Sequence, residues 1–132
     1  MLKLTRKVEY ALIALRHLQK LKIGELSSAK SMASAYGIPH ELLAKILQRL
    51  AKKNIVQAVK GPAGGYKIST DPTKINMTEF FEIMEGPMDI MDCYFDSQCE
   101  QISGCTIREP INRINDNIRS MFNKMTLADI TY

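Results

Sequence analysis

The sequence predicts a mainly α-helical protein with one small β-hairpin, and the pattern of apolar residues is the main evidence. Several stretches repeat apolar residues at helical spacing, one shorter stretch alternates around a glycine-rich centre, and the last helical stretch carries a narrow apolar seam. A chain of 132 residues can bury one core but hardly two independent ones. We therefore expect one domain with appendages.

The first half of the chain has the signals of a helix-turn-helix. Thr5 can cap a first helix, and Ser27 or Ser28 can open a second, shorter one. Gly37 permits the positive φ that ends this second helix, and Pro39, which is favoured in the first turn of a helix, leads directly into a third. The inner side of the third helix is expected to carry Leu42, Leu43, Ile46, Leu47 and Leu50. Two helices joined by a few residues around a glycine are typical of a helix-turn-helix.

A β-hairpin is expected directly behind the third helix. Residues 55–60 and 66–69 have the pattern of extended strands, and residues 61–65, with the sequence GPAGG, join them. A hairpin in this place is the wing of a winged helix-turn-helix, and its small tip lets the backbone approach another surface closely. A phosphate-binding nucleotide loop is set aside because the Gly-Lys-Ser/Thr ending and the helix expected after it are both missing.

The second half is expected to hold a fourth helix, a cysteine-containing loop and a long last helix. The fourth helix starts near residues 76–78 and is broken at Gly86-Pro87, after which an irregular stretch reaches about residue 106. Pro110 marks the first turn of the last helix, where an apolar seam runs between polar faces that include Asn115. The seam consists of Ile111, Ile114, Ile118, Met121 and Met125. It suits pairing with a second copy of the chain, and packing on the chain's own core is the alternative.

These elements divide the chain into three regions. Residues 1–75 form the winged helix-turn-helix, residues 76–106 the linking helix and the cysteine loop, and residues 107–132 the dimerisation helix with a C-terminal turn. Charge is distributed unevenly among them, since residues 1–60 contain twelve Lys or Arg and three Glu, whereas residues 79–100 contain seven acids and no base. This distribution fits a basic half that binds a polyanion and a separate sensing or assembly region, and two solvated faces are the alternative.

Double-stranded DNA is the polyanion that a winged helix-turn-helix would bind. The third helix offers its N-terminal turns and outer face to the major groove, where the candidate base readers are Pro39, His40, Glu41, Ala44, Lys45 and Gln48. Lys45 could reach guanine O6 and N7, and Glu41 could accept from cytosine N4. The candidate phosphate contacts, each with a solvated surface charge as its alternative, are Lys3, Arg6, Lys7, Arg49, Lys52 and Lys53. Thr5 and the wing residues Lys60, Gly61, Gly64, Gly65 and Tyr66 complete the set, with Lys60 placed to enter the minor groove.

We do not expect the three cysteines to form structural disulfides, so they either serve metal or redox chemistry or have no functional role. No apolar run reaches the roughly 20 residues that span a bilayer, and the N-terminus lacks a signal-peptide core, so a cytoplasmic location is expected. Thiols stay reduced there, and three cysteines is an odd number.

The chain also shows no nucleophile–base pair and no general acid–base constellation, so we do not expect an enzyme.

The three cysteines, Cys93, Cys99 and Cys105, are separated from one another by five residues each. This spacing matches neither the paired knuckles of a zinc ribbon nor the short cysteine run of bacterial ferredoxins. The polar loop around them is free to fold around a ligand, and three thiolates suit an iron–sulfur cluster, which needs a fourth ligand. A thiol switch, a zinc site and an electron carrier with an incidental basic half stay open as alternatives.

With these motifs in place, nearly the whole chain resembles the winged helix-turn-helix iron–sulfur transcription regulators of the IscR, NsrR, RirA and CymR type. The resemblance runs through Leu4-Thr5-Arg6, Tyr10-Ala11-Leu12, Gly37-Ile38, Lys60-Gly61-Pro62, Gly64-Gly65-Tyr66, the cysteine triplet and Thr126-Leu127-Ala128-Asp129. It implies a homodimer that binds a palindromic promoter site as a repressor or an activator. It also implies a two-iron or four-iron iron–sulfur cluster that senses iron, nitric oxide or redox state.

The resemblance leaves the fourth cluster ligand to be assigned. IscR-like members have a histidine three residues after the third cysteine, whereas this chain has Arg108 there. In NsrR-like members an acidic residue of the first helix reaches the cluster of the opposite subunit, and the matching position is Glu9. A carboxylate is a hard, labile ligand for iron and suits a cluster that is meant to be lost or attacked. The alternative for Glu9 is a surface ion pair with Arg6 or Arg16. The fallback ligands are His17, Asp92 and Asp96.

Overall fold

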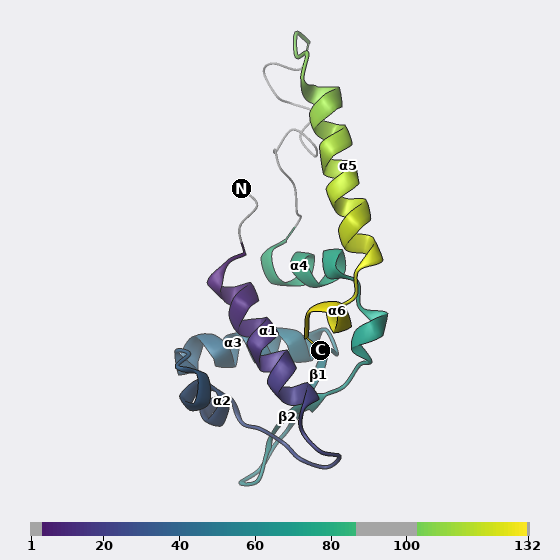
Figure 1. The fold of residues 1–132 in the computed structure, drawn as a ribbon. Coiled ribbons are helices and arrows are strands. Elements are labelled where there is room, and N and C mark those ends of the chain that lie inside the picture. The colour runs from purple at the N-terminus through teal and green to yellow at the C-terminus, as the bar shows by residue number, and fades with distance from the viewer. Residues whose placement is uncertain (1–3, 87–102, 132) are drawn as a thin grey trace.

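The computed structural model describes residues 4–86 and 103–131 of the chain (Figure 1). Its elements in chain order are α1 (Arg6–Gln19), α2 (Ala29–Tyr36), α3 (His40–Lys52), β1 (Val56–Val59), β2 (Gly65–Ile68), a 3-10 helix (Pro72–Lys74), α4 (Met77–Glu85), α5 (Arg108–Lys124) and α6 (Leu127–Thr131). The two strands pair antiparallel, so the predicted mainly helical fold with one small hairpin is confirmed. Within the described ranges, no helix is both long enough and apolar enough to cross a membrane.

Local capping contacts set the helix boundaries of the first half. Thr5 and Ser28 cap α1 and α2 with side-chain oxygens that accept a backbone amide three residues further on, at 3.4 and 3.0 Å. Gly37 ends α2 in the left-handed region at a φ of 65°. These three residues behave as predicted. Pro39 differs slightly, because it stands at the N-cap of α3 and the helix begins one residue later.

A shared apolar core joins α1, α3 and α4, and Figure 1 shows α1 in front of α3 with α4 above both. Leu15 of α1 and Phe80 of α4 are fully buried in this core. The buried residues of α3 are Leu43, Ile46, Leu47 and Leu50. Leu42 completes the predicted inner side but is half-buried at its edge. Each fully buried side chain of this size contributes about 1.5–3 kcal/mol, so the core fixes how α3 sits on the body.

The C-terminal helix α6 belongs to the same core. Leu127 is 1% exposed, and its amide donates a hydrogen bond to the Ile75 carbonyl at 2.8 Å, just before α4 begins. On its other side, Gln19 at the end of α1 donates through Nε2 to the Thr131 hydroxyl at 2.7 Å. The end of the chain is therefore held between α1 and the start of α4.

Helix α5 contacts α4 near its C-terminal end and extends away from the body at its other end (Figure 1). Phe122 packs edge-on against Phe81 with ring centroids 5.2 Å apart, and Arg119 forms an ion pair with Glu82 at 2.9 Å. Asn115, which belongs to the predicted polar faces, is only 2% exposed. The helical period shows which residues share a face but not whether that face is buried.

Candidate DNA-binding surface and cysteine region

The outer side of α3 carries the predicted base readers. Lys45, Gln48 and Lys52 follow one another at steps of three and four residues and are all exposed, so they form one row opposite the buried leucines. The accessible readers are Pro39, His40, Glu41, Lys45 and Gln48, with Ala44 half-buried beside them. This arrangement leaves a polar face of α3 open to a second molecule.

The predicted phosphate contacts do not all lie on the outer row of α3, since Arg6 and Lys7 belong to α1. Lys52 lies on the outer row, and Lys3 lies outside the described residues. Arg49 instead faces α4, where its Nη1 donates to the Met84 carbonyl at 3.1 Å. It contributes to an open cavity of about 660 Å³ whose charged lining residues are Lys7, Arg49, Lys53, Glu79, Glu82 and Glu85. Three cations and three carboxylates line this side, and Arg49 already has a partner in its own chain, so its contact with a phosphate stays a prediction.

The tip of the hairpin has a shape that requires glycine. The Gly64 amide donates to the Gly61 carbonyl at 2.9 Å, and Gly61 has a φ of 113°. A Cβ atom on Gly64 would lie 2.2 Å from the Val59 carbonyl oxygen, which no side chain tolerates. Lys60 and residues 61–63 are exposed at this tip. The wing can therefore meet another surface with its backbone and with the Lys60 ammonium group.

The root of the wing is tied to the start of α2, and no spacing pattern in the sequence marks this contact. The Ser27 amide donates to the Tyr66 carbonyl at 3.2 Å, and the Tyr66 amide donates to the Ser27 carbonyl at 2.8 Å. Gly65 permits this approach, since a Cβ there would lie 2.8 Å from the Ser27 carbonyl group. Tyr66 is half-buried and packs against the core. Gly65 and Tyr66, both predicted to contact DNA, thus hold the wing on the body.

His17 of α1 lies beside this root. Its Nδ1 is 2.8 Å from the Tyr36 hydroxyl oxygen, and its Nε2 is 3.1 Å from Ser27 Oγ. A metal-binding histidine needs one ring nitrogen for the metal. Because both nitrogens of His17 are engaged, the structure argues against this residue as a fallback cluster ligand.

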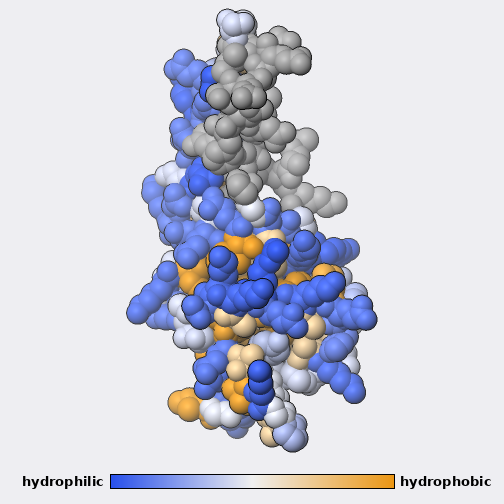
Figure 2. Space-filling view, turned by 180° about the vertical axis from the view of Figure 1, so that it is seen from behind, coloured by the Kyte–Doolittle hydropathy of each residue, from blue (hydrophilic) through white to orange (hydrophobic). Residues whose placement is uncertain are grey.

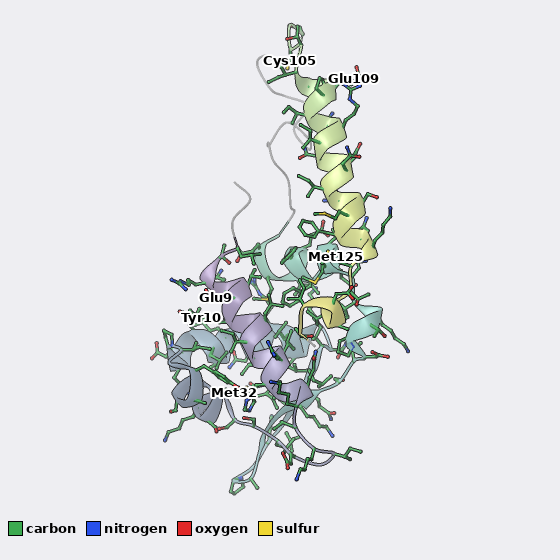
Figure 3. All side chains as sticks on the ribbon, viewed as in Figure 1. Glu9, Tyr10, Met32, Cys105, Glu109 and Met125 are labelled. Atoms are coloured by element: carbon green, nitrogen blue, oxygen red, sulfur yellow. The ribbon has the colours of Figure 1, made fainter. Side chains whose placement is uncertain are left out.

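Of the three cysteines, only Cys105 lies among the described residues. Cys93 and Cys99 lie outside them, as do the fallback ligands Asp92 and Asp96. Cys105 is half-buried and precedes α5 at the end that is far from the body (Figure 3). Within residues 4–86 and 103–131, no three His, Cys, Asp or Glu side chains form a group that could hold a metal ion.

Glu9 is on the body, at the exposed side of α1. Its carboxylate forms an ion pair with Arg6 at 2.8 Å, and this hydrogen bond raises the pKa of the Arg6 guanidinium. Arg108, which stands where IscR-like members have histidine, begins α5 beside Cys105. Figure 3 shows Cys105 at the far end of α5 and Glu9 on the body, so one chain alone does not bring these two groups together. An exposed ion pair is weak, and Glu9 could exchange its partner at little cost.

Part of the predicted seam of α5 is exposed. Ile114 and Met121 are 46% and 52% exposed, and Ile107, seven residues before Ile114, is 53% exposed. The sequence analysis missed Ile107, although its heptad spacing was a signal. The other seam residues, Ile111, Ile118 and Met125, are half-buried. The part of α5 visible from behind is hydrophilic (Figure 2), whereas Ile107, Ile114 and Met121 form an apolar stripe.

A helix-turn-helix with an exposed third helix and a hairpin directly behind it defines a winged-helix DNA-binding protein. Residues 4–132 match the Rrf2 family, which is described as iron-dependent transcriptional regulators. The chain belongs to this family. Its members are transcription regulators that bind DNA, so the expectation that this protein is not an enzyme is confirmed.

Individual relatives agree with this assignment. The chain is 29% identical to the HTH-type transcriptional regulator NsrR of Bacillus subtilis (strain 168) over 131 residues, which are 98% of this chain and 90% of that protein. The solved structure of CymR (YrzC), the global cysteine regulator of B. subtilis, is similar with a TM-score of 0.75 at 24% identity, over 99% of this chain and 97% of the other. The structure of T. potens IscR has a TM-score of 0.70 at 24% identity, over 97% and 85%. The predicted family and winged-helix fold are therefore confirmed.

Proposed function

We propose that this chain is a homodimeric regulator whose binding to a palindromic promoter site is modulated by an iron–sulfur cluster. Family membership supplies transcription regulation and DNA binding, and the dimer, the cluster and the individual contacts are the proposal. The observation that carries it is the exposed polar row of α3 beside a wing that is anchored to the same body. We expect the protein to act on chromosomal DNA in the cytoplasm.

In the proposed complex, α3 enters the major groove of the duplex. Lys45 and Glu41 lie at base edges, where an ammonium group can donate to guanine and a carboxylate can accept from cytosine. Lys52, further along the same row, neutralises a phosphate. The wing then follows the backbone, with Lys60 in the minor groove. The exposure of all four side chains supports this arrangement.

Helix α5 supplies the proposed dimer interface. Ile107, Ile114 and Met121 repeat every seven residues, the spacing of residues that pair two helices in a coiled coil. Their exposed fractions of about one half leave apolar area that a second α5 would cover. A two-fold dimer presents two equivalent α3 helices, which is why the expected site is palindromic.

The cluster is proposed to be bound by Cys93, Cys99 and Cys105 of one chain and by Glu9 of the other. The described residues fit this role in two respects: Cys105 lies outside the apolar core, and Glu9 is an accessible carboxylate that its own chain keeps away from Cys105. A bound cluster would supply an iron centre that is lost when iron is scarce or attacked by nitric oxide. The cysteines hold it through soft thiolates, whereas Glu9 offers a weaker, exchangeable bond.

Anaerobic purification tests the cluster directly. We expect visible iron–sulfur absorption, iron and acid-labile sulfide in the wild type, and loss of all three in Cys99→Ala and Cys105→Ala. Glu9→Ala should lower the lifetime of the cluster but not the far-ultraviolet circular dichroism, because Glu9 is exposed. Arg16→Ala, another exposed charge on α1, serves as the matched control. A colourless, iron-free wild type with full regulated DNA binding would contradict the proposal.

A second candidate keeps the DNA binding and replaces the cluster with a thiol switch or a zinc site. The observation that favours it is Cys105, a free and half-buried cysteine. Metal analysis separates the two candidates, since iron with sulfide supports the cluster and zinc or no metal supports the alternative. In a thiol switch, oxidation and reduction of Cys105 would change DNA affinity in protein that contains no metal.

A further inference from the structure

We propose that His17 positions the wing relative to the helix-turn-helix and so sets how the two parts reach one DNA site together. The inference rests on the proposed DNA surface, but His17 belongs to neither the base readers nor the phosphate contacts. It lies half-buried on α1, and all of its partners are among the described residues. Its role is that of a positioning residue.

His17 contacts both ends of α2. Tyr36 is the last residue of this helix, and its hydroxyl oxygen is 2.8 Å from His17 Nδ1. Ser27 directly precedes Ser28, the N-cap of the helix, and its Oγ is 3.1 Å from His17 Nε2. The His17 and Tyr36 rings also meet edge to face with centroids 5.5 Å apart. One side chain of α1 therefore fixes α2 at two points.

Ser27 extends this connection to the wing. Its side chain bonds His17, while its backbone exchanges two hydrogen bonds with Tyr66 of β2, at 3.2 and 2.8 Å. Ser27 is 7% exposed, so water does not easily replace these partners. The imidazole, the Ser27 hydroxyl, the Ser27 backbone and β2 thus form a continuous path. At the other end, Tyr36 directly precedes Gly37, where the chain turns toward α3.

The chemistry of the two contacts explains why a histidine suits this position. A neutral imidazole carries one donor and one acceptor nitrogen, and each hydroxyl group can donate or accept. Both contacts can therefore be made in either tautomer. Met32 and Ala33 bury one face of α2 in the shared core, and the two directional hydrogen bonds near its opposite ends add a fixed orientation relative to β2.

A short series of variants separates positioning from simple stabilisation. His17→Ala removes both contacts, whereas His17→Gln keeps a polar group near the position of Nε2, toward Ser27. His17→Asn keeps one near the position of Nδ1, toward Tyr36, and Tyr36→Phe removes that hydroxyl alone. Gln19→Ala is the matched control, because Gln19 is a half-buried polar residue of α1 whose hydrogen bond goes to α6 and not toward the wing.

The first measurement is amide hydrogen exchange in the free protein. In His17→Ala we expect exchange at the Ser27 and Tyr66 amides to rise roughly tenfold, because the bridge between them loses its support. His17→Gln should restore most of the protection, since it retains the Ser27 contact, and His17→Asn should restore less. Gln19→Ala should leave exchange at both amides unchanged even if it lowers the melting temperature.

The second measurement is footprinting on a duplex site selected with the wild-type protein. In His17→Ala, hydroxyl-radical protection in the minor groove beside the wing should weaken, with a roughly tenfold loss of affinity. Protection of guanine N7 in the major groove, which reports α3, should persist at saturating protein. A variant lacking only global stability would lose both footprints together.

The results of these two measurements distinguish a failure of the positioning role of His17 from a failure of the proposed DNA contact of the wing. His17→Ala with wild-type exchange at Ser27 and Tyr66 and a wild-type minor-groove footprint would overturn the positioning role. A wild type without any minor-groove footprint would instead contradict the proposed wing contact, and the exchange data would still decide whether His17 anchors the wing. If His17→Ala does not fold, His17→Asn and Tyr36→Phe answer the same questions.

Discussion

The DNA-binding end of this molecule is held against the body at several points, whereas the outer part of α5 extends from the body with few contacts in the described chain (Figure 1). Helix α3 is fixed by buried leucines, and the wing by the bridge between Ser27 and Tyr66. On α5, by contrast, Ile114 and Met121 are about half exposed. The first region has its fixed geometry within one chain, and the second carries an exposed apolar stripe that a second copy would cover in the proposed dimer.

This difference predicts how the two regions respond to mutation. A change on α3 or the wing removes one contact to DNA and leaves the rest in place, so its effect should be moderate and local. In the proposed dimer, a change on the exposed stripe of α5 should separate the two subunits and remove half of all DNA contacts at once. The size of each effect therefore tests which region a residue serves.

The largest effect is expected for Ile114→Glu, in the middle of the α5 stripe. A buried, unpaired carboxylate in the interface should dissociate the dimer, and DNA affinity should fall by about 100-fold or more because the half-sites are then bound separately. Sedimentation and gel-shift titrations measure the two consequences. Asn117→Glu, which adds the same charge at an exposed polar position of α5, should remain dimeric. A dimeric Ile114→Glu protein would show that α5 does not form the interface.

A smaller and more selective effect is expected for Lys45→Ala. If Lys45 reads guanine, its loss should cost roughly 1–3 kcal/mol of binding free energy and relax specificity at one position of the site. Lys52→Ala is the matched control on the same row of α3, and it should weaken binding to all sequences and lower the salt slope by about one. Titrations on the selected site and on single-base variants distinguish the two. Equal loss on every sequence in Lys45→Ala would place this residue on a phosphate.

The local structure of the DNA-binding end could be predicted from the sequence, and its long-range contacts could not. The caps Thr5 and Ser28 and the turn at Gly37 act within a few residues, so local spacing is enough to find them. The turning of Arg49 toward α4 and the contacts of His17 join elements far apart in the chain, and these depend on how the helices pack. Periodicity marks a polar or apolar face but does not show what covers it.

In the second half of the chain, too, the sequence pattern did not reveal the long-range contacts. Heptad spacing was enough to predict the seam of α5, but it did not show that Met125 packs against the core or that α6 closes it. The sequence predicts residues 107–132 as a dimerisation region, whereas the buried Leu127 and the hydrogen bond from Gln19 to Thr131 hold the C-terminal part of this region on the body. For the cluster, the decisive contact is proposed between two subunits, so no pattern within one chain could establish it.

Gly64→Ala tests the wing, with an expected loss of affinity below that of Lys45→Ala. The added Cβ would lie 2.2 Å from the Val59 carbonyl oxygen, so the tip must open, at a cost of about 1 kcal/mol, the lower end of the range for local backbone strain, because the exposed tip can shift. We expect affinity to fall several-fold with loss of minor-groove protection and with base specificity unchanged. Ala63→Ser, beside it in the exposed tip, is the control and should bind as the wild type does. A normal footprint in Gly64→Ala would show that the wing does not approach DNA closely.

The smallest effect on DNA binding is expected for Asn76→Ala, which changes the body that both regions share. Asn76 Oδ1 caps α4 by accepting the Glu79 amide at 2.7 Å, and losing such a cap lowers the free energy of unfolding by about 1 kcal/mol. The melting temperature should fall by roughly 3–5 °C in a calorimetric scan. Asn76→Asp keeps a capping oxygen and should be close to wild type. The backbone of Asn76 also pairs with that of Thr126, just before α6. Amide exchange in α6 should therefore become faster as well, while the dimer and the DNA footprint stay unchanged. A change in the dimer instead would mean that the stability of the body and the pairing of α5 are coupled through α4.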